Sequence, residues 1–185
     1  MSSVTIRFLF FVIILTPLLS VMKHPAIKPA PVKVTARLNW LSLKQVQDSA
    51  RINPKPILID LYTSWCGWCK VMDKKTYSDK NVIEYLQKNF YVVKLDAETK
   101  TDLNWYGRTY RFNPNYRAND FAVYLTNGNL SFPTTIVIPA SNIPPQAIPG
   151  YLEPKDFEMI ARYFGEDKYG KVAFNVFQQT FKSTW

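Results

Sequence analysis

Cysteine and histidine are scarce in the 185-residue chain, which has two cysteines and one histidine. The cysteines are Cys66 and Cys69, and His24 lies far from them in a proline-rich stretch. Structural zinc and iron–sulfur sites need about four cysteine or histidine ligands. The supply is too small for a metal site built from protein ligands alone, and we expect no metal.

Acidic residues are also few, since 14 Asp and Glu face 23 Lys and Arg and give a formal net charge of +9. This excess indicates attraction to anionic membrane surfaces or acidic partners. The basic residues are scattered and form no nucleic-acid motif, so we expect no nucleic-acid partner. There is no internal repeat, and a hydrophobic content of 47% is enough for the core of one medium-sized domain.

The two cysteines follow an apolar run, Ile57 to Tyr62, and are separated by Gly67 and Trp68. This pattern predicts a buried strand that delivers two thiols to the first turn of a helix, where residues three apart share a face and can bond. The chemistry expected is dithiol/disulfide exchange. A purely structural disulfide and two unrelated buried thiols are the alternatives. Closing so short a loop removes little entropy from the unfolded chain, which disfavours a structural bond.

The two cysteines should play unequal parts. Cys66 is expected at the helix N-terminus, where unpaired N–H groups and the positive end of the helix dipole favour a thiolate. We therefore predict that Cys66 is the nucleophile. Cys69 should lie one turn further in and be more covered, which suits the thiol that attacks Cys66 to release a bound partner.

Asp60 stands in the middle of the apolar strand, where a charged and unpaired carboxylate is costly to bury. Burial should raise the pKa of Asp60 and let its carboxylate accept the proton of the second thiol. The alternative is an Asp at the end of the strand that reaches solvent or caps the next turn.

Strand, acid and Trp65-Cys66-Gly67-x-Cys69-Lys70 in this order resemble the active-site segment of the thioredoxin family. The longer string to Tyr77 is more similar to exported bacterial thioredoxin-like proteins, including the carboxy-terminal domain of transmembrane thiol reductases. The likeness covers roughly residues 40 to 165. Trp68 departs from it, because thioredoxin itself has proline there, and this leaves the redox potential open.

The resemblance implies an α/β thioredoxin fold, in which helices flank a central mixed sheet, with an insertion before the cis-proline loop and an extra C-terminal helix. It makes Asp60 the buried carboxylate under the disulfide and Lys94 the lysine that faces it. A snorkelling lysine is the alternative for Lys94. It also implies a cis-proline loop at Phe132-Pro133-Thr134-Thr135 and a glycine after the last strand at Gly150.

The same resemblance implies a substrate-binding surface around the thiols. The backbone of Phe132 would pair with an extended substrate segment, as a strand added at a sheet edge. Aromatic side chains would form an apolar rim. The predicted substrate-binding residues are Trp65, Gly67, Trp68, Phe132, Pro133 and Thr134.

The N-terminus indicates export. Residues 1–22 combine Arg7 with an apolar run and no nearby acid, as in a signal peptide or membrane anchor. Residues 23–36 are a stiff linker rich in proline and lysine. We assign residues 37–168 to the thioredoxin-like domain and residues 169–185 to a helical extension, and expect a periplasmic protein or one tethered to the membrane and facing the exterior.

Periodicity and capping residues predict the remaining elements. Strands are expected at 57–62, 91–96, 134–138 and 146–150, the first two parallel in a βαβ unit. Helices are expected at 42–51, from 66, 79–89, 120–125, 154–163 and within 172–181. The Tyr- and Arg-rich segment Trp105 to Tyr116 would be either a partner-recognition element or a solvated insertion with some packed aromatics.

Together these observations predict an exported protein-disulfide oxidoreductase that acts on protein thiols and disulfides, as a reductant, with no cofactor beyond the Cys66–Cys69 pair. A membrane thiol reductase would supply electrons, and an uncleaved N-terminal segment would hold the protein at the membrane. One alternative is a disulfide oxidase or isomerase. Another is a tethered, non-catalytic binding or chaperone-like module that uses the aromatic surface without turnover.

Overall fold

The computed structural model describes residues 37–139 and 143–185. The chain divides into two compact units, and all described residues fall in the second, Val32–Trp185. The predicted signal or anchor (1–22) and linker (23–36) lie outside the described residues. Along the described part of the chain, no helix has the length and apolar character needed to cross a membrane.

Four strands form the central sheet: β1 (Ile57–Tyr62), β2 (Tyr91–Asp96), β7 (Thr134–Ile138) and β8 (Gln146–Pro149). Their order is β2-β1-β7-β8. Strand β1 runs parallel to β2 and antiparallel to β7, which is in turn antiparallel to β8. The sheet is therefore mixed, and the predicted parallel βαβ unit is confirmed.

The main helices begin where the sequence offers capping side chains. Ser42 and Gln45 form a capping box at α1, Asp79 caps α3 through two backbone N–H groups, and Asn119 caps α4. The observed bounds are α1 (Leu43–Ile52), α2 (Gly67–Lys75), α3 (Lys80–Asn89), α4 (Asp120–Leu125), α5 (Pro154–Gly165) and α6 (Phe174–Thr180). Each of these helices lies within two residues of its predicted bounds or inside the predicted segment.

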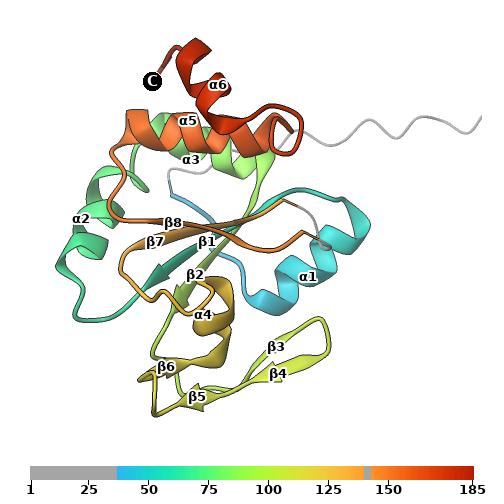
Figure 1. Cartoon of the computed structure of the whole chain (residues 1–185), viewed down its shortest axis with the longest axis vertical. Coiled ribbons are helices and arrows are strands. Elements are labelled where there is room, and N and C mark those ends of the chain that lie inside the picture. Colours follow the sequence, from blue (N-terminus) through green and yellow to red (C-terminus); the bar gives the residue numbers. More distant parts are fainter. Residues whose placement is uncertain (1–36, 140–142) are drawn as a thin grey trace, which may run out of the picture. The chain divides into compact units, whose positions relative to one another are not determined.

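The sheet is covered on both faces, as Figure 1 shows, by α3 and α5 on one side and by α1 and α4 on the other. Because side chains alternate along a strand, Leu58 of β1 packs with the first layer and Ile59 with the second. Every residue of β1 before Tyr62 is buried. Asp60 follows Leu58 by two residues and therefore lies on the face that α3 and α5 cover.

The segment between β2 and α4 is more regular than predicted. It contains two short hairpins, formed by β3 (Leu103–Trp105) with β4 (Arg108–Tyr110) and by β5 (Phe112–Asn113) with β6 (Ala118–Asn119). Strands of two or three residues are too short to show an alternating pattern in the sequence. Trp105 and Tyr110 are buried against Phe121 of α4, as expected for an insertion with packed aromatics.

One side chain joins the first hairpin to α1. The amide of Gln47 accepts a hydrogen bond from the Tyr106 N–H at 2.7 Å and donates one to the Asn104 carbonyl at 3.1 Å. Tyr106 has a positive φ of 45° at the hairpin tip, a conformation that few residues other than glycine adopt. Gln47 thus holds the hairpin in a conformation that its own sequence does not favour.

The C-terminal extension packs against α5. Helix α6 places Phe174 and Phe177 on Tyr163, with ring centroids 5.1 and 5.2 Å apart. Beyond α6, the last residues of the chain close over Glu158, which has no exposed surface. The Glu158 carboxylate accepts hydrogen bonds from the Ser183 hydroxyl at 2.6 Å and from the Thr184 N–H at 2.9 Å.

Candidate functional site

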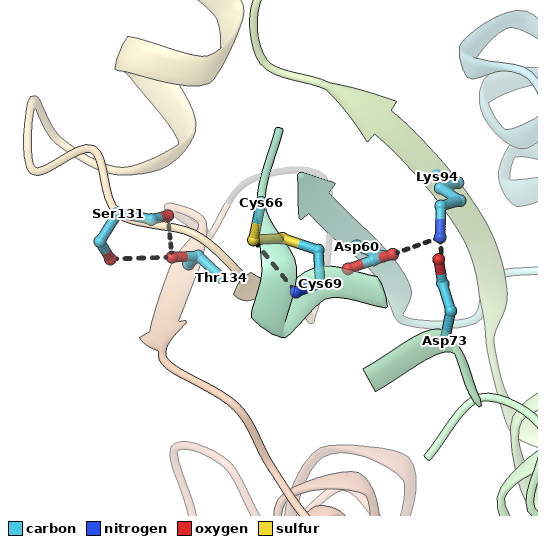
Figure 2. Close-up of a disulfide and its surroundings, with 7 residues drawn as sticks. All are labelled: Asp60, Cys66, Cys69, Asp73, Lys94, Ser131 and Thr134. Atoms are coloured by element: carbon cyan, nitrogen blue, oxygen red, sulfur yellow. Dashed lines mark hydrogen bonds and ion pairs between the residues drawn. A yellow bond between two sulfur atoms is a disulfide. The ribbon is translucent and has the colours of Figure 1, made fainter. Parts of the chain in front are cut away.

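The two cysteines form a disulfide at the N-terminus of α2, with their Cα atoms 5.4 Å apart (Figure 2). Cys66 is the N-cap residue of this helix, and its sulfur accepts a hydrogen bond from the Cys69 N–H at 3.0 Å. The same N–H is positioned to stabilise a thiolate on Cys66 once the bond is reduced. The predicted strand–thiol–helix arrangement is confirmed.

The expected difference in exposure between the two cysteines is not observed. Cys66 is 4% exposed and Cys69 is 3% exposed. The cause is local, since Cys66 caps the helix with its side chain turned inward over the first turn. The assignment of Cys66 as nucleophile therefore depends on its place at the helix N-terminus and not on greater accessibility.

Asp60 is buried at 2% exposure in the middle of β1, and its carboxylate lies 3.2 Å from the Lys94 ammonium group of β2. The predicted ion pair is confirmed, and register explains it, since Asp60 and Lys94 are directly opposite in the β1–β2 ladder. Burial raises the pKa of Asp60 to about 6, although Lys94 opposes the rise. The carboxyl group can therefore gain or lose a proton near neutral pH.

Lys94 has a second acidic partner, because its ammonium group also forms an ion pair with Asp73 of α2 (Figure 2). The Trp40 and Tyr62 rings lie 5.5 and 5.0 Å from the same nitrogen. Burial lowers the pKa of Lys94, but the two carboxylates outweigh it and raise that pKa above its ordinary value. Lys94 stays a cation and links β1 and β2 to the helix that carries the disulfide.

The loop before β7 has the predicted cis peptide bond between Phe132 and Pro133. The Thr134 hydroxyl is turned away from the surface and donates a hydrogen bond to the Ser131 carbonyl at 2.7 Å. Gly150 has a φ of +98°, which favours glycine, and its N–H donates a hydrogen bond to the Pro133 carbonyl at 2.8 Å. The end of β8 thereby fixes the position of the cis-proline loop.

Aromatic side chains lie on the surface beside the disulfide. Trp65 and Trp68 are 64% and 61% exposed, which is unusual for residues of this size. The Trp65 ring packs edge-on against Phe132 at 6.0 Å, and its N–H donates a hydrogen bond to Glu98 at 3.1 Å. These contacts join the cysteine loop to the cis-proline loop in one apolar patch, and exposed Gly67 lies beside them.

A family model matches residues 32–147, well over half of the chain. It is Thioredox_DsbH, whose description reads "Protein of unknown function, DUF255". The chain belongs to the Thioredox_DsbH family. The predicted thioredoxin-like relationship is thereby confirmed.

Relatives by sequence match the Thioredox_DsbH chain over short segments. It is 36% identical over 56 residues to the thiol:disulfide interchange protein DsbD of Campylobacter jejuni strain RM1221, a match that covers 30% of this chain and 10% of that protein. It is 32% identical over 57 residues to human spermatogenesis-associated protein 20, covering 31% of this chain and 7% of that protein. The chain thus spans about a tenth or less of the length of these relatives.

Solved structures confirm the thioredoxin fold. A structure titled "DsbH Oxidoreductase" matches with a TM-score of 0.52 at 14% identity, covering 78% of this chain and 95% of that one. A thioredoxin from Thermus thermophilus matches with a TM-score of 0.52 at 16% identity, covering 72% and 90%. This Thioredox_DsbH chain is thus a thioredoxin-fold protein related to bacterial thiol:disulfide oxidoreductases.

Sequence reasoning missed three residues at the site of this Thioredox_DsbH protein. Asp73 follows Cys69 by four residues, one helical turn on, and this spacing could have indicated a carboxylate on the same face. Tyr151, whose ring lies 5.5 Å from the Trp68 ring, directly follows the glycine that the resemblance did identify. Glu98, the partner of Trp65, lies in a loop and has no comparable signal in the sequence.

The site holds no metal cluster among its described residues. Over residues 37–139 and 143–185, no group of three His, Cys, Asp or Glu side chains could bind a metal ion. The reactive groups that the geometry does bring together are a disulfide, a buried carboxyl group that titrates near pH 6 and a lysine ammonium group. These groups can support transfer of electrons and protons between thiols and a disulfide.

Proposed function

We propose that this protein is an exported thiol:disulfide oxidoreductase that reduces disulfides in protein partners. The observation that supports it most directly is the disulfide at the N-terminus of α2, with a buried carboxyl group of raised pKa on the strand that precedes it. A structural disulfide has no use for a buried carboxyl group beside it. A redox-active pair does, because its second thiol must lose a proton before it can attack, and the carboxylate can accept that proton.

In the first step the reduced protein attacks a partner. The Cys66 thiolate, stabilised by the Cys69 N–H and the N-terminus of α2, attacks one sulfur of the partner's disulfide. The partner's sulfur–sulfur bond breaks and a mixed disulfide with Cys66 forms. The displaced partner sulfur leaves as a thiolate and takes a proton from water.

In the second step Cys69 resolves this mixed disulfide. The Asp60 carboxylate accepts the Cys69 proton, and the resulting thiolate attacks the sulfur of Cys66. The bond between the Cys66 sulfur and the partner breaks, and the partner's second sulfur leaves as a thiolate that takes up the proton from Asp60. The protein is left with the Cys66–Cys69 disulfide, which is the form that the structure contains.

Each cycle takes two electrons from the protein, so a reductant needs a dithiol donor outside this chain. We propose a membrane thiol reductase in this role, because an oxidising exterior would otherwise keep the pair oxidised. The similarity to a segment of DsbD, a thiol:disulfide interchange protein, supports thiol–disulfide exchange as the chemistry of this chain. Periplasmic location and attachment through residues 1–22 are parts of the same proposal.

Protein partners would bind at the apolar patch beside the disulfide. Trp65 and Trp68 offer exposed aromatic surface beside the partly buried Phe132, and the Phe132–Pro133 backbone would pair with an extended segment of the partner. Aromatic contacts of this kind tolerate varied sequences, so this surface suits unfolded or extended chains better than one specific ligand.

The proposal is tested by trapping with Cys69→Ala, which leaves Cys66 free to attack and removes the thiol that resolves. In the native compartment we expect mixed disulfides at Cys66 that disappear on treatment with a thiol reductant. The matched control carries Cys66→Ser as well and should trap nothing. The absence of any adduct in the single variant would contradict disulfide exchange with proteins.

The exposed aromatics also suit a binding module without turnover. Cys66→Ser separates the two functions, because it should abolish reduction of insulin disulfides while leaving any binding of unfolded chains unchanged. The reduction potential of the Cys66–Cys69 pair separates a reductant from an oxidase or isomerase. A potential near that of strong oxidants would contradict the proposed direction.

A further inference from the structure

Asp60 has a second neighbour in the sheet besides Lys94. In the antiparallel β1–β7 ladder Asp60 lies opposite Thr135, and in the parallel β1–β2 ladder it lies opposite Lys94. Residues that are directly opposite in neighbouring strands place their side chains on the same face, with Cβ atoms about 5 Å apart. Thr135, Asp60 and Lys94 therefore form a row across three strands, under α2.

The Thr135 hydroxyl is buried and has no hydrogen-bond partner in the described protein. The Tyr77 hydroxyl, at the end of the turn that follows α2, is likewise buried without a partner. The two hydroxyls lie close enough that the Thr135 hydroxyl lowers the pKa of Tyr77 against the larger effect of burial, but the pair does not reach hydrogen-bond geometry. Buried hydroxyls are normally paired, because an unpaired one costs free energy, so two of them together need an explanation.

Packing does not explain the threonine. Thr135 has no exposed surface and lies in β7 between Thr134 and Ile136, where valine would fill the same volume without burying a polar atom. Tyr77 contributes its ring to the core through edge-on contacts with Trp40 and Phe157, and phenylalanine would supply the same ring. The two hydroxyl groups are thus the parts of these side chains that packing does not need.

Asp60 is the acid near both hydroxyls. It faces Thr135 across the β1–β7 ladder. Burial raises the pKa of the Tyr77 phenol well above its ordinary value, and the negative charge of Asp60 adds to this rise. The other ionisable groups around it are Lys94 on β2, Asp73 and Cys69 on α2, and Tyr62 on β1. Of these, Lys94 alone supplies a positive charge, and Asp73 shares it.

We propose that Thr135 and Tyr77 are positioning residues whose hydroxyls donate hydrogen bonds to the Asp60 carboxylate during resolution of the mixed disulfide. The inference rests on the proposed function and deepens it, because it says how a deeply buried acid stays partly ionised. The hydroxyls act directly after rotation of the side chains or through one buried water. They stabilise the carboxylate that must take the Cys69 proton.

The first test follows Asp60 itself and does not depend on any partner. Titration of the Asp60 carboxyl carbon by NMR in the reduced protein should give a higher pKa in Thr135→Val and in Tyr77→Phe than in the wild type, because a donor to the charged form is lost. Thr135→Ser keeps the hydroxyl and should restore the wild-type value. Thr126→Val is the control, since Thr126 is also buried but its hydroxyl bonds to the Ala122 carbonyl in the layer on the other face.

The second test measures resolution. A mixed disulfide between Cys66 and a thiol-bearing peptide should resolve about 2- to 10-fold more slowly in Thr135→Val than in the wild type at pH 6, the loss expected for one hydrogen bond. The difference should shrink at higher pH, where Asp60 is ionised in both proteins. Thr126→Val should match the wild type throughout.

Failure of the inference about Thr135 and Tyr77 can be distinguished from failure of the proposed disulfide reduction. An unchanged or lower pKa of Asp60 in both Thr135→Val and Tyr77→Phe would overturn the inference, even if the protein reduces disulfides. A wild-type protein that reduces no disulfide would overturn the proposed function and leave the Asp60 titration as a separate result. If Thr135→Val does not fold, the pKa of Asp60 in Tyr77→Phe tests the inference alone, and an unchanged or lower value there would overturn it.

Discussion

Asp60 experiences two opposing effects that decide its behaviour. Removal from water raises its pKa, while the positive charge of Lys94 lowers it, and the value of about 6 shows that burial dominates. The ordinary value is 3.8. An acid that stays protonated longer in the folded than in the unfolded chain makes folding less favourable as the pH rises between these two values.

Asp60→Asn should therefore stabilise the oxidised protein at pH 7, on the order of 3 kcal/mol, a difference that already includes the attraction of Lys94 because the pKa of about 6 does. Below about pH 3.8 the acid is protonated in both states and the difference should vanish. The measurement is urea unfolding of both proteins from pH 3 to 8. A stability difference that stays constant over this range would show that Asp60 does not titrate as inferred.

The same substitution should remove the base that serves Cys69. Resolution of a mixed disulfide at Cys66 should become slow at pH 6 and should recover only when Cys69 ionises by itself at higher pH. An unchanged pH dependence in Asp60→Asn would separate Asp60 from the chemistry, whatever it does to stability.

At the scale of elements, helix α5 ends at a glycine for steric reasons. A Cβ atom at Gly165 would lie 2.8 Å from the Tyr85 hydroxyl and 2.9 Å from a ring carbon of Phe90, closer than real Cβ contacts. Tyr85 belongs to α3 and Phe90 follows it, so the glycine lets the end of α5 approach α3 closely. Such contacts set the spacing of the two helices over the sheet.

Gly165→Ala should destabilise the protein by about 1 to 3 kcal/mol, because it overpacks this contact. The measurement is chemical unfolding with the disulfide intact. Adding Tyr85→Phe to Gly165→Ala removes the nearest colliding atom and should restore part of the loss. If the double variant were no more stable than Gly165→Ala alone, the collision with Tyr85 would not be the cause.

The sequence predicted the regular elements well and the insertion poorly. All four strands of the sheet were predicted within one residue, because each is a short stretch rich in apolar and β-branched residues that is bounded by turn residues. The hairpins β3–β4 and β5–β6 were not predicted. Their stability comes from contacts across the fold, such as Gln47 with Tyr106 and Trp105 with Phe121, which no local pattern shows.

The same distinction applies to the site. Cys66, Cys69 and Asp60 stand in one short segment, and their placement could be predicted from spacing and from the cost of burying an acid. Lys94 and Pro133 needed the family resemblance, since a lysine or proline near a strand end has many ordinary explanations. Glu98, Asp73 and Tyr151 depend on tertiary packing and became visible only in the structure.

At the scale of the whole molecule, the last residues of the chain are held against α5 by one buried acid. Hydrogen bonds from Ser183, Thr184 and Arg162 lower the pKa of Glu158 to about 2 despite its burial. Burial is the largest single effect on this carboxylate and raises its pKa, but the hydrogen bonds from the tail and Arg162 together outweigh it. Glu158 is thus a charged anchor for the extension.

Glu158→Gln should lower the stability at pH 7 by about 1 to 3 kcal/mol, because it weakens hydrogen bonds to a charged acceptor and leaves Arg162 without this partner. An acid with a depressed pKa contributes stability above its ordinary value of 4.5 and loses it as the pH falls toward 2. Unfolding curves of both proteins should therefore converge between these values. Equal differences at pH 7 and pH 2.5 would exclude a charged anchor.

The hydrogen bonds of Gln47 couple the opening of the β3–β4 hairpin to the opening of α1. The side-chain amide of Gln47 accepts a hydrogen bond from the Tyr106 N–H at the tip of the β3–β4 hairpin, where the Tyr106 side chain is 45% exposed. Amide hydrogens in a solvent-facing turn normally exchange fast, because the turn opens locally at little cost in free energy. Here the tip can open only when it separates from α1, so hairpin and helix form one cooperative unit, and the Tyr106 amide hydrogen should exchange as slowly as those of the helix that holds it.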